Sequence, residues 1–102
     1  MAKKYALVTG GSRGIGRAIC LKLAENGIPV LVGYRSNESA AEEVRNTIIH
    51  NGGSAFVLRL DVSDKDSVEA ALDNWEAAHP DDYIAYLVNN AGVTHDELMF
   101  RM

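Results

Sequence analysis

The sequence has a single cysteine and no long hydrophobic run, and both absences restrict what the chain can be. Cys20 has no second cysteine to pair with, so the chain holds no internal disulfide, and the apolar neighbours of Cys20 predict a small buried side chain rather than a reactive thiol. The apolar run near the amino terminus breaks at Gly10, too early for a secretion signal or a membrane span. We therefore expect a cytoplasmic protein that makes no contact with membranes.

Basic clusters and histidine groupings are also missing. Ten Lys and Arg stand against fourteen Asp and Glu, a net charge of −4, and the basic residues are scattered. Nucleic-acid binding depends on neutralising phosphates with clustered positive charge, so no nucleic-acid partner is expected. His50, His79 and His95 have no partner at metal-ligand spacing, so we expect solvated side chains and no metal site.

What the sequence does contain is a regular alternation of strand and helix patterns within 102 residues, enough for one domain with one core. Four short apolar runs are typical of buried strands, at residues 5–8, 30–34, 55–58 and 84–88. Because parallel strands need helical crossovers, the alternation predicts an α/β domain with a doubly wound parallel sheet in the order 3-2-1-4. Arg59 and the shortness of the third run favour an edge position for that strand.

Three amphipathic helix patterns separate these strands. The first begins at Gly14 and ends at Asn26-Gly27. Capping boxes predict the starts of the other two, Ser39 with Glu42 and Ser63 with Asp66. The residues expected on the inner faces are Ile15, Ile19 and Leu23 in the first helix, Ala40, Val44 and Ile48 in the second, and Val68, Leu72 and Trp75 in the third.

A glycine-rich segment joins the first strand to the first helix, with the sequence Thr9-Gly10-Gly11-Ser12-Arg13-Gly14-Ile15-Gly16. Glycines at such a turn let the backbone approach a diphosphate closely, and the first turn of the helix offers free N–H groups and a partial positive charge. The alternative is a loop that only turns the chain. The motifs elsewhere in the sequence, described next, favour a nucleotide site over a loop that only turns the chain.

The spacing Thr-Gly-x-x-x-Gly-x-Gly resembles the fingerprint of the short-chain dehydrogenases/reductases, and the family's Asn-Asn-Ala-Gly motif follows the fourth strand. Asp61-Val62 matches a third family position, which meets the adenine. The resemblance implies a Rossmann-like domain that binds a nicotinamide cofactor. The expected cofactor-binding residues are Gly10, Gly11, Ser12, Arg13, Gly14, Ile15, Gly16, Arg35, Ser36, Asp61, Val62, Asn89, Asn90, Ala91 and Gly92.

The residues after the second strand indicate which cofactor. An NAD-selecting site places Asp or Glu there to bind the ribose hydroxyls, whereas this chain has Tyr34-Arg35-Ser36. The guanidinium of Arg35 offers a fork of donors to the 2′-phosphate of NADP, and Arg13 could reach the same group. We therefore expect NADP(H). The alternative is that Arg35 is solvated and Glu38 is the true selector.

The catalytic residues that the resemblance implies do not occur in this sequence. The family uses a Ser, an Asn and a Tyr with a Lys four residues later, and none of the four tyrosines has that lysine. One helical turn between Tyr and Lys would put the ammonium beside the phenol and lower its pKa for proton transfer. We expect residues 1–102 to be the dinucleotide-binding half of a single domain, truncated after the fourth strand, without the catalytic half.

Within the family, the glycine loop and the segments Asn89 to Thr94 and Leu98 to Met102 look most like 3-oxoacyl-[acyl-carrier-protein] reductases of fatty-acid synthesis. That likeness implies an acyl-carrier-protein thioester as substrate and a homotetrameric parent enzyme. The alternatives are reduction of another carbonyl such as acetoacetyl-CoA, a nucleotide-binding module without catalysis, or a chain that no longer binds. We also expect the unpaired edge of the fourth strand to pair with another copy or with the tail.

Overall fold

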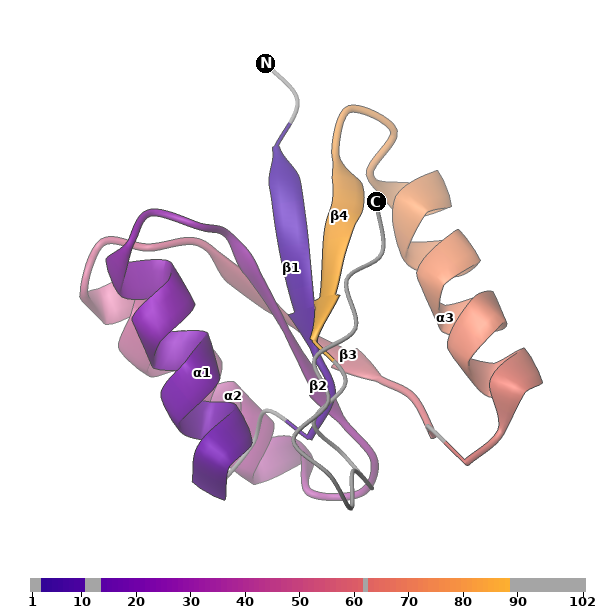
Figure 1. Ribbon diagram of the computed structural model, residues 1–102, viewed down its shortest axis with the longest axis horizontal. Coiled ribbons are helices and arrows are strands. Elements are labelled where there is room, and N and C mark those ends of the chain that lie inside the picture. Colours follow the sequence, from indigo (N-terminus) through magenta and orange to yellow (C-terminus); the bar gives the residue numbers. More distant parts are fainter. Residues whose placement is uncertain (1–2, 11–13, 62, 89–102) are drawn as a thin grey trace.

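A computed structural model of the chain describes residues 3–10, 14–61 and 63–88 (Figure 1). Strands and helices alternate along the chain. In order they are β1 (Lys4–Val8), α1 (Gly14–Glu25), β2 (Val30–Tyr34), α2 (Glu38–His50), β3 (Ala55–Arg59), α3 (Lys65–Ala78) and β4 (Tyr83–Val88). This succession confirms the predicted α/β class.

The four strands form one parallel sheet in the order β3-β2-β1-β4, which confirms the predicted 3-2-1-4 arrangement. Among these strands β3 and β4 are the two edges, as expected for β3. Because all strands run the same way, their carboxyl ends meet at one edge of the sheet, the lower one in Figure 1. Pairing of the β4 edge with another copy stays a prediction.

Helices cover both faces of the sheet, with α1 and α2 on one side and α3 on the other (Figure 1). Neighbouring residues of β1 divide between the two layers: Val8 packs with Cys20 and Val44 under α1 and α2, and Leu7 packs with Leu72 under α3. The inner strands are therefore buried on both faces, and this explains their continuous apolar runs. Cys20 and Trp75 are buried as predicted, and burial raises the pKa of the Cys20 thiol to about 12.

Both predicted capping residues prove wrong by one or two positions. The side chain of Asn37, not Ser39, caps α2 by accepting a hydrogen bond from the Ala40 N–H at 3.1 Å. The carboxylate of Asp64, not Ser63, caps α3 by accepting from the N–H groups of Asp66 and Ser67. Asn and Asp cap a helix at least as well as Ser, so residue type does not distinguish these candidates. Asn37 and Asp64 are the caps because they stand directly before the first residue of each helix. The inner face of α2 accordingly carries Ala41 rather than Ala40.

Two side chains lie in surroundings that the sequence did not indicate. Ile15 is 72% exposed, because α1 packs through Gly16 and Cys20 instead. His79 is half-buried rather than solvated: its ring stacks on Trp75 at 4.3 Å, and its Nδ1 lies 2.9 Å from the Trp75 carbonyl oxygen. His50 is exposed as expected.

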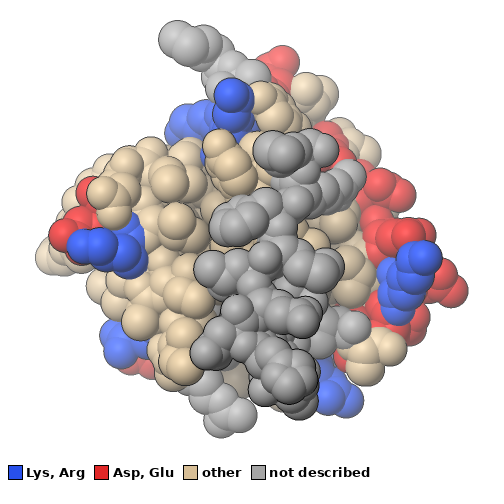
Figure 2. Space-filling view, in the orientation of Figure 1, with Lys and Arg blue, Asp and Glu red and all other residues tan. Residues whose placement is uncertain are grey.

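The outer side of the α3 layer is mainly acidic (Figure 2). Its helix contributes three exposed acidic residues, Asp66, Glu69 and Asp73. Within the described ranges, no helix is both long and apolar enough to cross a membrane. The same residues contain no group of three or more His, Cys, Asp or Glu side chains that could hold a metal ion.

Gly33 is required where β2 passes β1 and the end of β3. A Cβ atom at this position would lie 2.8 Å from the carbonyl oxygen of Val8 and 3.2 Å from a methyl carbon of Leu60. We predict that Gly33→Ala lowers the free energy of unfolding by about 1–3 kcal/mol, because a backbone oxygen cannot move aside without disturbing the sheet. Urea denaturation measures the change, with Asn74→Ala on the exposed face of α3 as a control expected to be nearly neutral. An unchanged midpoint for Gly33→Ala would contradict this packing.

Candidate cofactor site

The predicted cofactor residues that the structure describes all follow strands or open α1 at the carboxyl edge of the sheet. Gly10 comes after β1, Arg35 and Ser36 follow β2, and Asp61 follows β3. Residues separated by up to 51 positions are thereby brought to one edge. Open parallel sheets bind ligands outside this edge, next to the two neighbouring strands whose crossovers leave in opposite directions. In this sheet the two strands are β1 and β4.

Glycines occupy both described ends of the loop between β1 and α1. Gly10 has a φ of 65° and Gly14 a φ of 60°, values that residues other than glycine rarely adopt. The backbone can therefore turn sharply from the strand into the helix, and the turn does not depend on side-chain packing, because a Cβ on Gly14 would meet nothing within 4 Å. Gly16 is buried in α1, and Ile15 beside it faces outward.

The first turn of α1 differs from those of the other two helices. It contains no acidic residue, whereas the first turns of α2 and α3 contain Glu38 and Asp66. A helix start carries free N–H groups and about half a positive charge, which favours an anion. The opening of α1 therefore suits a phosphate group from outside the chain, and this is the feature a dinucleotide cofactor requires.

Thr9 fixes the loop to the sheet. Its backbone N–H donates to the carbonyl oxygen of Val88 at 3.0 Å, and its hydroxyl, in a residue only 2% exposed, donates to the same oxygen at 3.4 Å. The end of β1 is thus tied to the end of β4. Gly10, the first glycine of the loop, is therefore held next to the end of β4. In the sequence, the Asn-Asn-Ala-Gly segment follows directly after β4.

A cleft of about 380 Å³ opens between the ends of β2 and β3. Its lining residues are Arg35, Ser36, Arg59, Leu60, Asp61 and Ser67. Across it the Nε atom of Arg35 lies 3.8 Å from Oδ2 of Asp61, with 75% and 36% of the two side chains exposed. Solvent-exposed pairs of this kind contribute little to stability, so both groups can turn to a bound ligand at small cost.

Asp61 is held in its ionised form. Its Oδ1 accepts hydrogen bonds from the Ser63 hydroxyl at 2.6 Å and from the Ser63 N–H at 3.0 Å. These two bonds, and after them the nearby charge of Arg35, lower the pKa of Asp61 below its usual 3.8. The cleft therefore offers an acceptor next to the guanidinium donors of Arg35.

Glu38, the alternative selector, lies in the first turn of α2. Its carboxylate accepts a hydrogen bond from the Tyr34 hydroxyl at 3.4 Å. Burial and then the charge of Glu38 raise the pKa of that phenol. Glu38 is not among the residues that line the cleft, and the hydrogen bond described for its side chain is the one with Tyr34.

The structure brings together one part of the predicted set and leaves another part outside the described residues. Gly10, Gly14, Ile15, Gly16, Arg35, Ser36 and Asp61 lie at the carboxyl edge. Gly11, Ser12, Arg13, Val62, Asn89, Asn90, Ala91 and Gly92 lie outside the described ranges. Sequence reasoning missed Arg59, Ser63 and Ser67. The spacing of Asp61 and Ser63 is that of an Asx turn, which could have indicated one of them.

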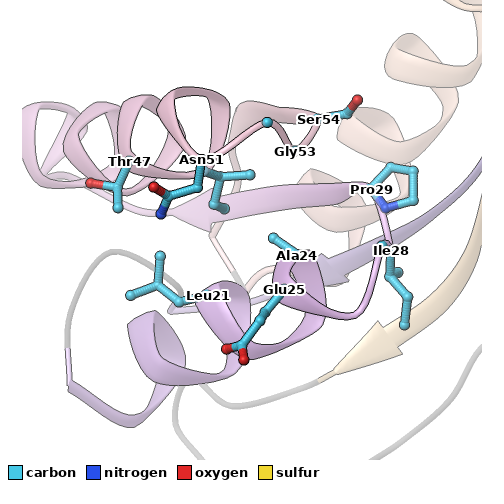
Figure 3. Close-up of a pocket in the computed structure, with 12 residues that line it drawn as sticks. Leu21, Ala24, Glu25, Ile28, Pro29, Thr47, Asn51, Gly53 and Ser54 are labelled. Carbon is cyan, nitrogen blue, oxygen red and sulfur yellow. The ribbon is translucent and has the colours of Figure 1, made fainter.

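A larger cavity of about 600 Å³ lies at the opposite end of the sheet, where α1 and α2 end (Figure 3). Leu21, Ala24, Ile28 and Pro29 form one side of it, and Thr47, Asn51 and Ser54 are on the other. Among its described lining residues there is no Lys or Arg and no helix start. It therefore lacks the groups that would bind a phosphate.

Comparison with known proteins gives one family for nearly the whole chain. The family model described as short chain dehydrogenase matches residues 4–102. An uncharacterized oxidoreductase of Escherichia coli K12 is 53% identical over 91 residues, which is 86% of this chain and 35% of that protein. A 3-oxoacyl-[acyl-carrier-protein] reductase of Staphylococcus aureus is 44% identical over 99 residues, 97% of this chain and 39% of that protein.

Solved structures agree with the sequence matches. A dehydrogenase/reductase of Sinorhizobium meliloti 1021 superimposes with a TM-score of 0.79 at 39% identity, covering 93% of this chain and 37% of that one. An angucycline C-6 ketoreductase solved with bound NADP gives a TM-score of 0.77 at 39% identity, covering 88% and 37%. The chain spans well under half the length of the proteins that it matches.

The hydrogen bonds around Asp61 predict how it titrates. Ser63→Ala removes the hydroxyl bond and keeps the N–H bond, so it should raise the pKa of Asp61 toward 3.8; Arg35→Gln should raise it less, because the Ser63 hydroxyl lowers this pKa most and the charge of Arg35 least. Since the folded-state pKa is the lowered one, ionised Asp61 stabilises the fold above pH 3.8, and this stabilisation is lost as the pH falls through the folded-state pKa. NMR titration of the side-chain carboxyl carbon of Asp61 in each variant measures the pKa shift. A larger shift with Arg35→Gln than with Ser63→Ala would contradict the assignment.

Proposed function

The chain belongs to the short chain dehydrogenase family, and on that premise we propose that it is the dinucleotide-binding part of a reductase that uses NADPH. One observation carries the choice of NADPH over NADH. At the end of β2, where a carboxylate would accept hydrogen bonds from the ribose hydroxyls, the chain places the guanidinium of Arg35 in a cleft with Ser36. A cationic fork suits a phosphate and does not suit a neutral diol.

The described residues fit such a cofactor in two places. The glycine turn and the first turn of α1 would hold the diphosphate, because Gly10 and Gly14 permit a close approach and no acidic residue stands in that turn. Arg35 and Ser36 would hold the 2′-phosphate, and the carboxylate of Asp61 would accept from the adenine. Arg13 and the residues from Asn89 to Gly92 are expected to complete the site.

In the whole protein the cofactor would supply a hydride to a carbonyl carbon. The task of this chain's residues is to bind and orient the adenosine and diphosphate, so that binding energy far from the reacting atoms positions the nicotinamide. Proton transfer to the carbonyl oxygen requires other groups. We propose that the Tyr and Lys of the family's catalytic set, which this sequence does not contain as a Tyr-x-x-x-Lys pair, are supplied by a further part of the protein.

For the substrate we propose a 3-oxoacyl thioester on acyl-carrier protein. Several relatives with 42–44% identity over nearly the whole chain are named 3-oxoacyl-[acyl-carrier-protein] reductase, including proteins of Staphylococcus aureus and Synechocystis. A second candidate is favoured by a different observation: the relative with 53% identity is an oxidoreductase whose name gives no substrate. Reduction of another carbonyl compound, such as acetoacetyl-CoA, is therefore the alternative.

We predict that the chain binds NADPH more tightly than NADH, and that Arg35→Asp reverses the order. The loss of charge-assisted hydrogen bonds to the phosphate, and the repulsion that the new carboxylate adds, should weaken NADPH binding by at least about tenfold. Fluorescence titration of the bound nicotinamide measures both affinities. Arg45→Gln, outside the cleft on α2, is the control. Equal affinities for the two cofactors in the unmodified chain would refute the choice of NADPH.

The substrate proposal is tested on the protein encoded by the complete reading frame. We predict that it oxidises NADPH with acetoacetyl-acyl-carrier protein at a higher kcat/KM than with acetoacetyl-CoA, followed by absorbance at 340 nm. The two thioesters share the reacting carbonyl, so a difference reports recognition of the carrier. Equal or reversed values would support the alternative substrate class.

A further inference from the structure

A second arginine lines the cleft that holds Arg35. Arg59 is the last residue of β3 and is exposed. In the parallel register it stands opposite Tyr34, one residue before Arg35, and the Leu60 N–H donates to the Tyr34 carbonyl oxygen at 2.9 Å. The sheet therefore fixes the backbone of Arg59 next to the backbone of Arg35, although the two residues are 24 positions apart in the sequence.

The charge of Arg59 is not used within the described residues. No carboxylate oxygen among them lies within 4.0 Å of its guanidinium, whereas Arg35 has Asp61 as a partner. Its charge does act on Tyr34, the residue opposite it in the sheet, whose pKa it lowers against the larger raising effects of burial and Glu38. An arginine that has no counter-charge in the described part of the chain, and that lines a cleft beside another arginine, is a ready site for an anion.

We propose that Arg59 is a specificity-determining residue that binds the 2′-phosphate of the cofactor together with Arg35. The inference rests on the proposed use of NADPH and adds a residue to it. A phosphate dianion at the mouth of this cleft could accept hydrogen bonds from two guanidiniums and from the Ser36 hydroxyl, which matches its three oxygens. Arg59 would then discriminate NADPH from NADH and leave the diphosphate and nicotinamide unaffected.

The test uses two small probes that differ in the group concerned. Adenosine 2′,5′-bisphosphate carries the 2′-phosphate and 5′-AMP lacks it, so the ratio of their affinities isolates this contact. We predict that Arg59→Gln weakens binding of the bisphosphate by about tenfold and leaves 5′-AMP unchanged, as expected for the loss of charge-assisted hydrogen bonds. NMR titration of backbone amides gives both dissociation constants for the 102-residue chain.

Two further variants test whether the effect of Arg59→Gln comes from lost local hydrogen bonds or from lost charge, and urea denaturation tests for an effect on stability. Arg59→Lys keeps the charge but loses the fork, and should give an intermediate ratio. Arg45→Gln removes the same charge from α2, outside the cleft, and should leave the ratio as it is. The urea midpoint of each variant is measured as well, and we expect it to stay near that of the unmodified chain because Arg59 is exposed on an edge strand.

The outcomes distinguish this inference from the proposed function. If the unmodified chain prefers the bisphosphate and Arg35→Gln removes the preference while Arg59→Gln does not, the role of Arg59 is refuted and NADPH use stands. If Arg45→Gln lowers the ratio as much as Arg59→Gln, the effect is one of net charge and the proposal also fails. If the unmodified chain shows no preference between the probes, NADPH selection and the role of Arg59 fall together.

Discussion

Parallel alignment of the four strands is the constraint on which the candidate site depends. Backbone hydrogen bonding holds β1 in register with β2 on one side and with β4 on the other, so the residues after each strand must emerge at one edge. The buried Thr9 reinforces this by donating two hydrogen bonds to Val88. The glycine turn, the exposed start of α1 and the cleft between β2 and β3 are adjacent for that reason, although their residues are far apart in the sequence.

Charge then distinguishes this edge from the rest of the molecule. The chain as a whole carries a net charge of −4, and acidic side chains gather over α3 (Figure 2). At the carboxyl edge the cleft instead presents Arg35 and Arg59, with Asp61 kept ionised mainly by Ser63. The larger cavity at the other end of the sheet has more room but no cationic side chain among its described lining residues. Size alone would favour that other end, whereas phosphate binding needs N–H donors and positive charge, which favour the carboxyl edge.

Much of the fold could be predicted because local patterns and topology agreed. Doubly buried strands give continuous apolar runs, and helical crossovers leave few strand orders, so the 3-2-1-4 sheet followed from the sequence. The failures came where several residues could do the same task or where only tertiary contacts decide. Ser39 and Ser63 were plausible caps, yet Asn37 and Asp64 stand where the helices begin. Nothing local shows that α1 turns Ile15 outward, or that the strand register brings Arg59 beside Arg35.

The most direct measurement of the central claim is a map of backbone amide shifts on addition of NADP to the isotope-labelled chain. We predict that the shifted signals belong to the carboxyl edge, from Gly10 and the first turn of α1 to Arg35 and Asp61. Signals of Thr47 and of residues 51–54, which line the cavity at the opposite end, should stay in place. Shifts confined to that opposite end, or spread evenly over the chain, would contradict a dinucleotide site built on the ends of the parallel strands.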